Sequence, residues 1–143
     1  MSLTGVWLNE LSSIMTLVDV TDGTLKGKYR SLVGHDPHPR ELAGRTSSEE
    51  QSKQLLGFSV CFQIDEPVAE HGHFSICTWS GWSRGNTITA HWILTRSLLR
   101  AEDEWSSTLL GKDCFERVLD VPDEEQLLAS KGALAQLLAK ARS

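Results

Sequence analysis

Two pairs of histidines are the first side chains in this sequence whose spacing suggests chemistry. His71 and His73 would share one face of a strand, and His35 and His38 share a short segment. Such pairs could bind a metal or exchange protons with a substrate. Neither pair is joined by a cysteine or a carboxylate at the spacing of metal sites, and histidines in loops are usually solvated. We therefore predict no metal site and no acid–base centre.

The three cysteines are the next candidates. Cys61, Cys77 and Cys114 are odd in number and lack the paired spacing of zinc ligands, so we expect reduced thiols. Cys77 would need an adjacent base to act as a nucleophile, and no histidine stands beside it on the same strand face. A thiol of this kind usually fills space in a core. We expect a binding protein without cofactors, and an enzyme that uses the histidine loop and Cys77 stays open as a rival interpretation.

One carboxylate stands apart from the other charged residues. Asp113 has the same parity as Phe115 on a predicted strand, so both side chains would face the interior. The alternative is a surface position near the end of the strand. An inward carboxylate in an apolar interior needs a partner, because water no longer solvates its charge. Parity with Phe115 favours the interior position.

Three tryptophans mark the strands that would position these groups. Trp79, Trp92 and Trp105 recur thirteen residues apart, a spacing that suits consecutive antiparallel strands joined by short loops. The strand through Trp79 has large side chains on both faces. Its small polar and aromatic face indicates a pocket wall, and its apolar face indicates packing outside the sheet. The first face carries Ser75, Cys77 and Trp79, and the second carries Phe74, Ile76 and Trp82.

The rest of the chain continues the pattern of short strands. An Asp-Gly turn at 22–23 and a proline-rich loop at 34–40 separate segments of alternating polarity. Eight strands with short links and no helix between them predict an all-β fold, an eight-stranded antiparallel up-and-down β-barrel over residues 1–118. Such a barrel has room for one small ligand. The predicted strands span residues 5–10, 14–19, 25–31, 41–46, 55–64, 72–82, 88–95 and 105–115.

The end of the chain departs from the strand pattern. After Pro122, an acidic segment at 123–125 precedes leucines at helical spacing. We predict that residues 119–143 form a short C-terminal tail or an amphipathic helix that packs on the barrel or on a neighbouring chain.

Length and charge narrow the class of protein further. The chain has 143 residues with ordinary hydrophobic content, which indicates one domain. A net charge of -5 argues against nucleic acid or an anionic membrane as partner. The chain begins without the basic region and apolar run of a signal peptide, so we predict a cytoplasmic location, with secretion as the alternative if a leader has been removed.

Several segments together resemble the avidin and streptavidin family, and in character the fungal, tamavidin-like avidins. They occur in family order with family-like spacing over about residues 3 to 118. Streptavidin is itself a known example of an eight-stranded barrel that holds one ligand. The segments are L-T-G-V-W-L-N-E-L-S-S, G-T-L-K-G-K-Y-R-S-L-V-G, L-G-F-S-V, T-W-S-G, W-I-L-T and W-S-S-T-L-L-G-K-D-C-F.

The resemblance implies that the ligand is biotin, held without covalent chemistry. It assigns the donors to the ureido oxygen to Asn9, Ser13 and Tyr29. The two ureido N–H groups would donate to Asp113 and Ser31. A carboxylate on one side and donors on the other polarise the ureido group, which makes each bond charge-assisted.

The resemblance also implies the contacts to the rest of biotin. Trp79 and Trp92 match aromatic walls around the bicyclic ring and the valeryl chain, and Leu94 joins this wall. Ser75 and the backbone of His35 match the positions that meet the ligand carboxylate at the pocket mouth.

Trp105 matches a tryptophan that reaches into the pocket of a neighbouring subunit, so the resemblance implies a homotetramer. The outward apolar residues of the strand through Trp79 independently suggest that outer faces are buried.

Two positions depart from the family pattern. Phe62 stands where the family usually has tryptophan, and Cys77 stands where it usually has threonine. The smaller ring costs on the order of 1 kcal/mol of contact, and a weaker hydrogen bond costs about as much. We expect affinity to fall by about one to two powers of ten and still be high.

Two other interpretations stay open. Trp79 and Trp92, taken singly, would more often be plain core residues. A lipocalin-like carrier of another small apolar ligand would make the polar residues incidental. The resemblance favours high-affinity biotin binding, with sequestration of the vitamin as a defence.

Overall fold

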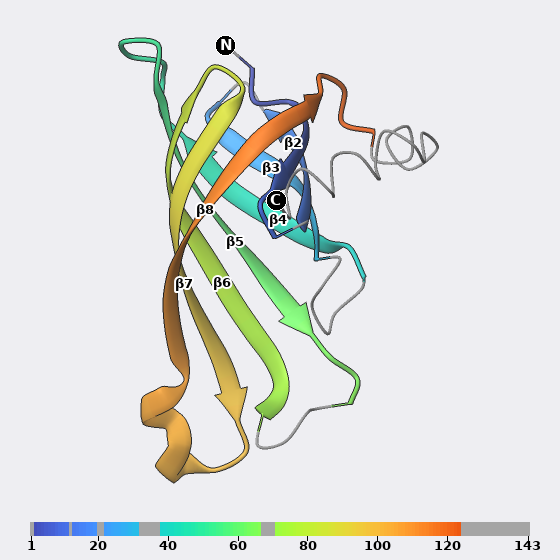
Figure 1. Cartoon of the computed structure of the whole chain (residues 1–143), viewed down its shortest axis with the longest axis vertical. Coiled ribbons are helices and arrows are strands. Elements are labelled where there is room, and N and C mark those ends of the chain that lie inside the picture. The colour runs from blue at the N-terminus through green and yellow to red at the C-terminus, as the bar shows by residue number, and fades with distance from the viewer. Residues whose placement is uncertain (1, 12, 20–21, 32–37, 67–70, 124–143) are drawn as a thin grey trace.

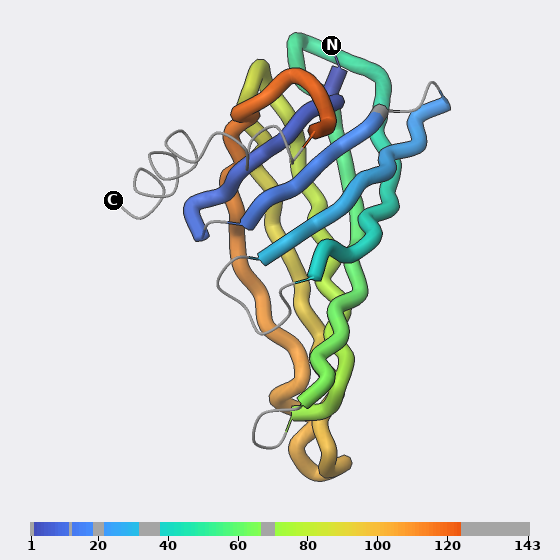
Figure 2. Tube along the Cα trace, turned by 90° about the vertical axis from the view of Figure 1, so that its right-hand side faces the viewer, coloured from blue at the N-terminus to red at the C-terminus, as the bar shows by residue number. Residues whose placement is uncertain are grey.

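The chain forms a closed barrel of eight antiparallel strands. The computed structural model describes residues 2–11, 13–19, 22–31, 38–66 and 71–123. Each strand pairs with its sequence neighbours, and the last strand pairs with the first (Figures 1 and 2). The predicted up-and-down barrel is thereby confirmed. The strands are β1 (Gly5–Asn9), β2 (Ser13–Asp19), β3 (Thr24–Ser31), β4 (Arg40–Thr46), β5 (Gln54–Gln63), β6 (His71–Arg84), β7 (Thr87–Leu98) and β8 (Thr108–Leu119).

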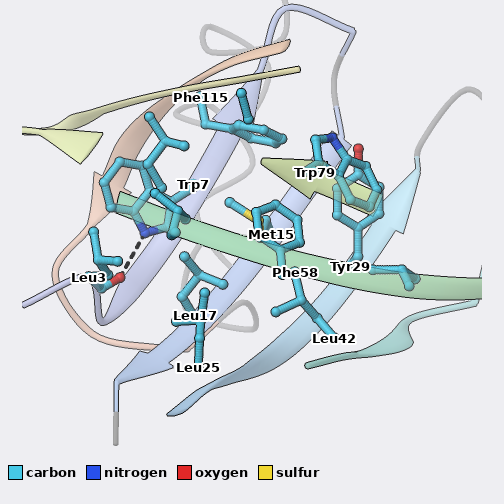
Figure 3. Close-up of a cluster of buried hydrophobic side chains, with 14 of the residues drawn as sticks. Leu3, Trp7, Met15, Leu17, Leu25, Tyr29, Leu42, Phe58, Trp79 and Phe115 are labelled. Carbon is cyan, nitrogen blue, oxygen red and sulfur yellow. Dashed lines mark hydrogen bonds between the residues drawn. The ribbon is translucent and has the colours of Figure 1, made fainter. Parts of the chain in front are cut away.

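Alternation of side chains divides the strands into an inner and an outer face. On β3, Leu25 and Tyr29 are buried while Lys26 and Lys28 are exposed, as the period of two predicts. The inner faces of all eight strands meet in one apolar cluster (Figure 3). Its largest fully buried member is Trp7. The barrel interior is therefore a packed core over part of its length.

A second, smaller cluster lies on the outer face of β1 and β2. Val6, Leu8 and Ile14 alternate with the inward residues of these strands and are nevertheless at most 6% exposed. Val118 and Leu119 pack against them. Every residue of β1 is consequently buried.

The two halves of the barrel differ in length. β1 to β4 have five to eight residues, whereas β5 to β8 have ten to fourteen. The longer strands form one wall that extends past the shorter ones at the end where β7 turns into β8 (Figure 1). This wall is where a ligand could gain contacts beyond the core.

One prediction about the connections is wrong. A 3₁₀ helix, η1 (Ala101–Ser106), lies between β7 and β8, and Trp105 belongs to it rather than to a strand. The backbone N–H groups of Asp103 and Ser107 bond the carbonyls of Arg100 and Glu104, at 3.1 and 3.0 Å. Local bonds thus replace pairing with β7, so β8 begins only at Thr108.

Of the predicted tail, the structure describes only residues 119–123. β8 ends at Leu119, next to the predicted boundary of the barrel. The predicted C-terminal tail or helix covers residues 119–143, of which residues 124–143, like His35, lie outside the described residues. Among the described residues, no helix is long and apolar enough to cross a membrane.

Arg117 closes the end of the barrel at which the chain begins. Its guanidinium lies over the Trp7 ring, 4.7 Å from the ring centroid. It also donates to the carbonyls of Thr4 at 3.0 Å and Ser2 at 2.7 Å. The Trp7 indole N–H donates to the Leu3 carbonyl at 2.9 Å (Figure 3). The polar groups at this end therefore hold the N-terminal segment across the core.

We expect Arg117→Met to lower the free energy of unfolding by about 1–3 kcal/mol, because it removes two charge-assisted hydrogen bonds and a cation–π contact. Denaturant unfolding would measure the change. Arg84→Met, at the exposed end of β6, is the matched control and should change stability little. Equal effects of the two substitutions would contradict the role of Arg117.

Candidate ligand-binding site

A cavity occupies the barrel interior away from the Arg117 end. Its volume is about 510 Å³, within the range of roughly 300–1,000 Å³ that is usual for small-molecule sites. Its lining extends from Asn9 on β1 and Asp113 on β8 to the long wall of β5, β6 and β7. Most of the predicted ligand contacts line it: Asn9, Ser13, Tyr29, Ser31, Phe62, Ser75, Cys77, Trp79, Trp92, Leu94 and Asp113.

Two predicted contacts are not among the lining residues. His35 lies outside the described part of the chain. Trp105 is 87% exposed on η1, so it does not line the cavity of its own chain.

Sequence reasoning missed several lining residues near the end of β7 and the start of β6. Arg96 follows Trp92 and Leu94 at a period of two, so the strand pattern could have found it. His71 and His73 also line this end, where the His73 Nδ1 atom lies 2.9 Å from the Ile64 carbonyl. The remaining lining residues are Leu11, Ile64, Gly72 and Phe74.

Asn9 lines the cavity, and its side-chain orientation is fixed by the backbone. Its Oδ1 atom accepts hydrogen bonds from the backbone N–H of Leu11 at 3.0 Å and of Ser13 at 2.8 Å. Both partners are donors, so the accepting atom must be the carbonyl oxygen. The turn between β1 and β2 thus orients Asn9 as a hydrogen-bond donor toward a ligand.

Tyr29 lies in the same buried polar corner. Burial raises the pKa of its hydroxyl, and hydrogen bonding by Ser13 and Asn9 opposes that rise. The phenol therefore stays protonated at neutral pH. Together with Asn9 and Ser13 it forms a group of neutral donors on β1, β2 and β3.

Asp113 supplies the buried acceptor of the site. It is 4% exposed, and its Oδ2 atom accepts a hydrogen bond from the Trp79 indole N–H at 2.9 Å. Its Oδ1 atom is buried and has no hydrogen-bond partner. Burial raises the pKa of Asp113, and the bond from Trp79 partly offsets this rise. The predicted inward position is correct, and one carboxylate oxygen remains available.

Cys77 lies beside this carboxylate as a neutral thiol. Burial, and to a lesser degree the charge of Asp113, raises its pKa to about 12. Since the thiolate is the reactive form, Cys77 is not an activated nucleophile. The three cysteines are free. Among the described residues, no cluster of three or more histidine, cysteine, aspartate or glutamate side chains could hold a metal.

Aromatic rings form one wall of the cavity. Trp79 stacks on Phe58 with ring centroids 4.9 Å apart and also contacts Tyr29 at 5.0 Å. Tyr29 in turn meets Phe62 edge-on at 5.8 Å. These contacts fix the Trp79 ring, and with it the N–H that bonds Asp113.

Trp92 depends on a glycine in the neighbouring strand. Gly111 stands opposite Trp92 in the β7–β8 register, and the indole ring lies over its backbone. A Cβ at Gly111 would overlap the ring atoms of Trp92. The absence of a side chain at Gly111 is what lets Trp92 lie along the cavity wall.

Gly111→Ala should displace the Trp92 ring and lower the free energy of unfolding by about 1–3 kcal/mol, because the paired backbone of β8 cannot move away. Near-UV circular dichroism and denaturant unfolding would report both changes. Gly57→Ala is the control, since a Cβ there would meet only the Trp79 carbonyl oxygen, at 3.4 Å. An unchanged tryptophan signal in Gly111→Ala would contradict this account of Trp92.

The arrangement as a whole is suited to holding a ligand. Neutral donors and one buried acceptor converge near Asn9 and Asp113, and an aromatic wall leads from there along the long strands. A small molecule with a polar, hydrogen-bonding head and an apolar body would satisfy both parts.

Comparison with known proteins identifies the family of this chain. The chain is 28% identical to avidin-related protein 2 of Gallus gallus over 119 residues, covering 81% of this chain and 77% of that protein. It is 26% identical to avidin-related protein 4/5 of the same species over 125 residues, covering 85% and 81%. Residues 1–118 match the model of the avidin family. The chain belongs to the avidin family.

Proposed function

We propose that this protein binds biotin non-covalently in the barrel cavity. The observation that carries the proposal is the buried Oδ1 atom of Asp113, which has no partner although it lies in a cavity rich in donors. An unpaired buried acceptor lowers the stability of the protein. A ligand N–H that donates to it removes this penalty and so favours binding. Membership of the avidin family supports biotin as the ligand.

The proposed complex uses the two polar sides of the cavity in opposite senses. Asn9, Ser13 and Tyr29 donate to the ureido oxygen, while Asp113 and Ser31 accept from the ureido N–H groups. The fixed orientation of Asn9 supports the first assignment, since its carbonyl oxygen is already occupied. Donors and acceptor are held before the ligand arrives, which limits the entropy cost of binding.

The body of the ligand would lie along Trp79, Trp92 and Leu94. Phe62 and Cys77 are the two departures from the family pattern, and both line the cavity. Their smaller contact and weaker donor reduce affinity without removing a charged contact. High affinity, and sequestration of the vitamin as its purpose, remain part of the proposal. The cytoplasmic location and the kinship with fungal avidins stay predictions.

Titration calorimetry with biotin tests the proposal directly, and Asp113→Asn is the decisive variant. We expect it to weaken biotin binding by about 10- to 100-fold, because a charge-assisted hydrogen bond becomes a neutral one. Asp120→Asn changes the same charge at an exposed position and should leave affinity unchanged. Equal affinity of wild type and Asp113→Asn would favour a carrier of another apolar ligand.

The raised pKa of Asp113 adds a pH dependence of known sign. The carboxyl is protonated more readily in the folded, ligand-free barrel than in the unfolded chain, so its stabilising contribution is lost as pH rises through the folded pKa. At pH 7 Asp113→Asn should therefore make the ligand-free barrel more stable. Biotin affinity of the wild type should fall as pH drops through that pKa, which lies above the ordinary value of 3.8.

We also propose that copies of the chain associate, most simply as a homotetramer, through the outer face of the long wall. Ile76 on β6 and Ile93 on β7 are each 52% exposed, and Leu110 on β8 is 74% exposed. Ile93 and Leu110 face each other in the β7–β8 register, so these side chains form a continuous patch. Patches of this kind usually mark interfaces. Trp105, which is exposed on η1, would then reach the cavity of a neighbouring copy.

Ile93→Lys should shift the protein toward smaller assemblies, because it places an unpaired charge in the proposed interface. Sedimentation velocity would measure the size. The same variant should release biotin faster if Trp105 covers the ligand from a neighbouring copy. Val18→Lys changes an exposed apolar residue on the outer face of β2 and is the matched control. A wild-type monomer that binds biotin would overturn the association alone.

A further inference from the structure

Arg96 lines the cavity near the end of β7, with its side chain toward the interior. It continues the inward series of Trp92 and Leu94 on β7 and lines the cavity together with them. In the β6–β7 register it stands directly opposite Ser75. Ser75 in turn pairs with Phe62 on β5. Three neighbouring strands thus present one cation, one hydroxyl and one aromatic ring at the same level of the cavity.

The guanidinium of Arg96 lacks a partner among the described residues. Its Nε atom is buried and makes no hydrogen bond. Arg100, which lies beyond the end of β7, differs because its guanidinium bonds Glu102. A guanidinium stays charged at every relevant pH and can only donate, so leaving its buried Nε atom without an acceptor is costly. The missing acceptor is therefore expected from whatever occupies the cavity.

The backbone around this end is held firmly. Between His71 and Ser75 the β6–β7 register shifts by a bulge. Ser97 spans the bulge, because its hydroxyl accepts from the Phe74 N–H and donates to the Phe74 carbonyl, each at 3.1 Å. Gly72 passes close to the Ser97 side chain, where a Cβ would collide. The backbone next to Arg96 is therefore fixed by the Ser97 hydrogen bonds to β6.

The separation of the two polar ends matches one type of ligand. Arg96 lies four residues along β7 from Trp92, and Ser75 lies four residues along β6 from Trp79. At about 3.3 Å per residue, this is roughly 13 Å from the aromatic wall near Asp113. The long arginine side chain can cover part of that span. A ligand that fits carries neutral N–H groups at one end and an anion on a short apolar chain at the other.

We propose that Arg96, assisted by the Ser75 hydroxyl, binds the carboxylate of the ligand and so selects free biotin over neutral biotin derivatives. The inference rests on the proposed biotin binding and adds the residue that decides specificity at the mouth. An arginine can meet a carboxylate with two parallel hydrogen bonds, which a neutral amide cannot reciprocate. The net charge of the chain is -5, so this contact depends on the local placement of Arg96 rather than on the overall field.

The test compares biotin with biotin amide, in which the carboxylate is replaced by a neutral group. Titration calorimetry on the wild type should show about tenfold or greater preference for biotin. Arg96→Gln should weaken biotin binding by about tenfold and leave the affinity for biotin amide unchanged. Arg96→Lys should restore part of the preference. Arg84→Gln removes the same charge at an exposed site on β6 and should leave both affinities as in the wild type.

The outcomes separate the two proposals. If wild type binds both molecules equally well, or if Arg96→Gln weakens both to the same extent, the role of Arg96 is overturned while biotin binding stands. If neither molecule binds to wild type, both proposals are overturned. Raising the salt concentration should reduce the preference for biotin in wild type and leave Arg96→Gln unaffected, which separates a charge effect from altered packing.

Discussion

The pairing of β8 with β1 is the contact on which the site depends. It closes the barrel and sets Asn9 opposite Phe115, so that the Asn9 amide and the Asp113 carboxylate face the same interior space. Beyond the end of β1, the Glu10 carboxylate accepts the backbone N–H of Cys114 at 3.0 Å and extends the pairing. A slip by one residue would turn Asp113 outward and Cys114 inward. The β1–β8 register that closes the barrel is therefore also the one that turns Asp113 into the cavity.

Both ends of the barrel contain buried polar atoms, and some of these atoms have no partner among the described residues. At the Arg117 end, the Trp7 indole and two guanidinium N–H groups reach backbone carbonyls, whereas the Nε atom of Arg117 is buried without a partner. In the cavity, an oxygen of Asp113 and the Nε of Arg96 are buried without partners. Unpaired buried groups lower stability. The unpaired Oδ1 of Asp113 and Nε of Arg96 therefore lower stability in a region where a ligand could pair with them.

Strand parity explains which parts of this structure a sequence can reveal. The period of two correctly placed Asp113, Tyr29 and Trp79 inside, because a half-buried strand must alternate. The same rule would have found Arg96, but its charge directs attention to the surface. η1 was missed since its turn depends on local backbone bonds rather than on hydrophobic period. The Trp92 packing was also hidden, because the glycine that permits it lies nineteen residues away on another strand.

In the proposed complex, the binding energy is distributed differently from the family pattern. Phe62 and Cys77 provide less contact and a weaker donor near the middle of the cavity. Arg96 adds a charged contact at the mouth, where the register places it beside Ser75. Apolar contact in the middle contributes to every ligand with the same ring system, whereas an ion pair at the mouth contributes only to those with a free carboxylate. Exchanging one for the other lowers general affinity and raises discrimination, since specificity is a difference between affinities rather than their sum.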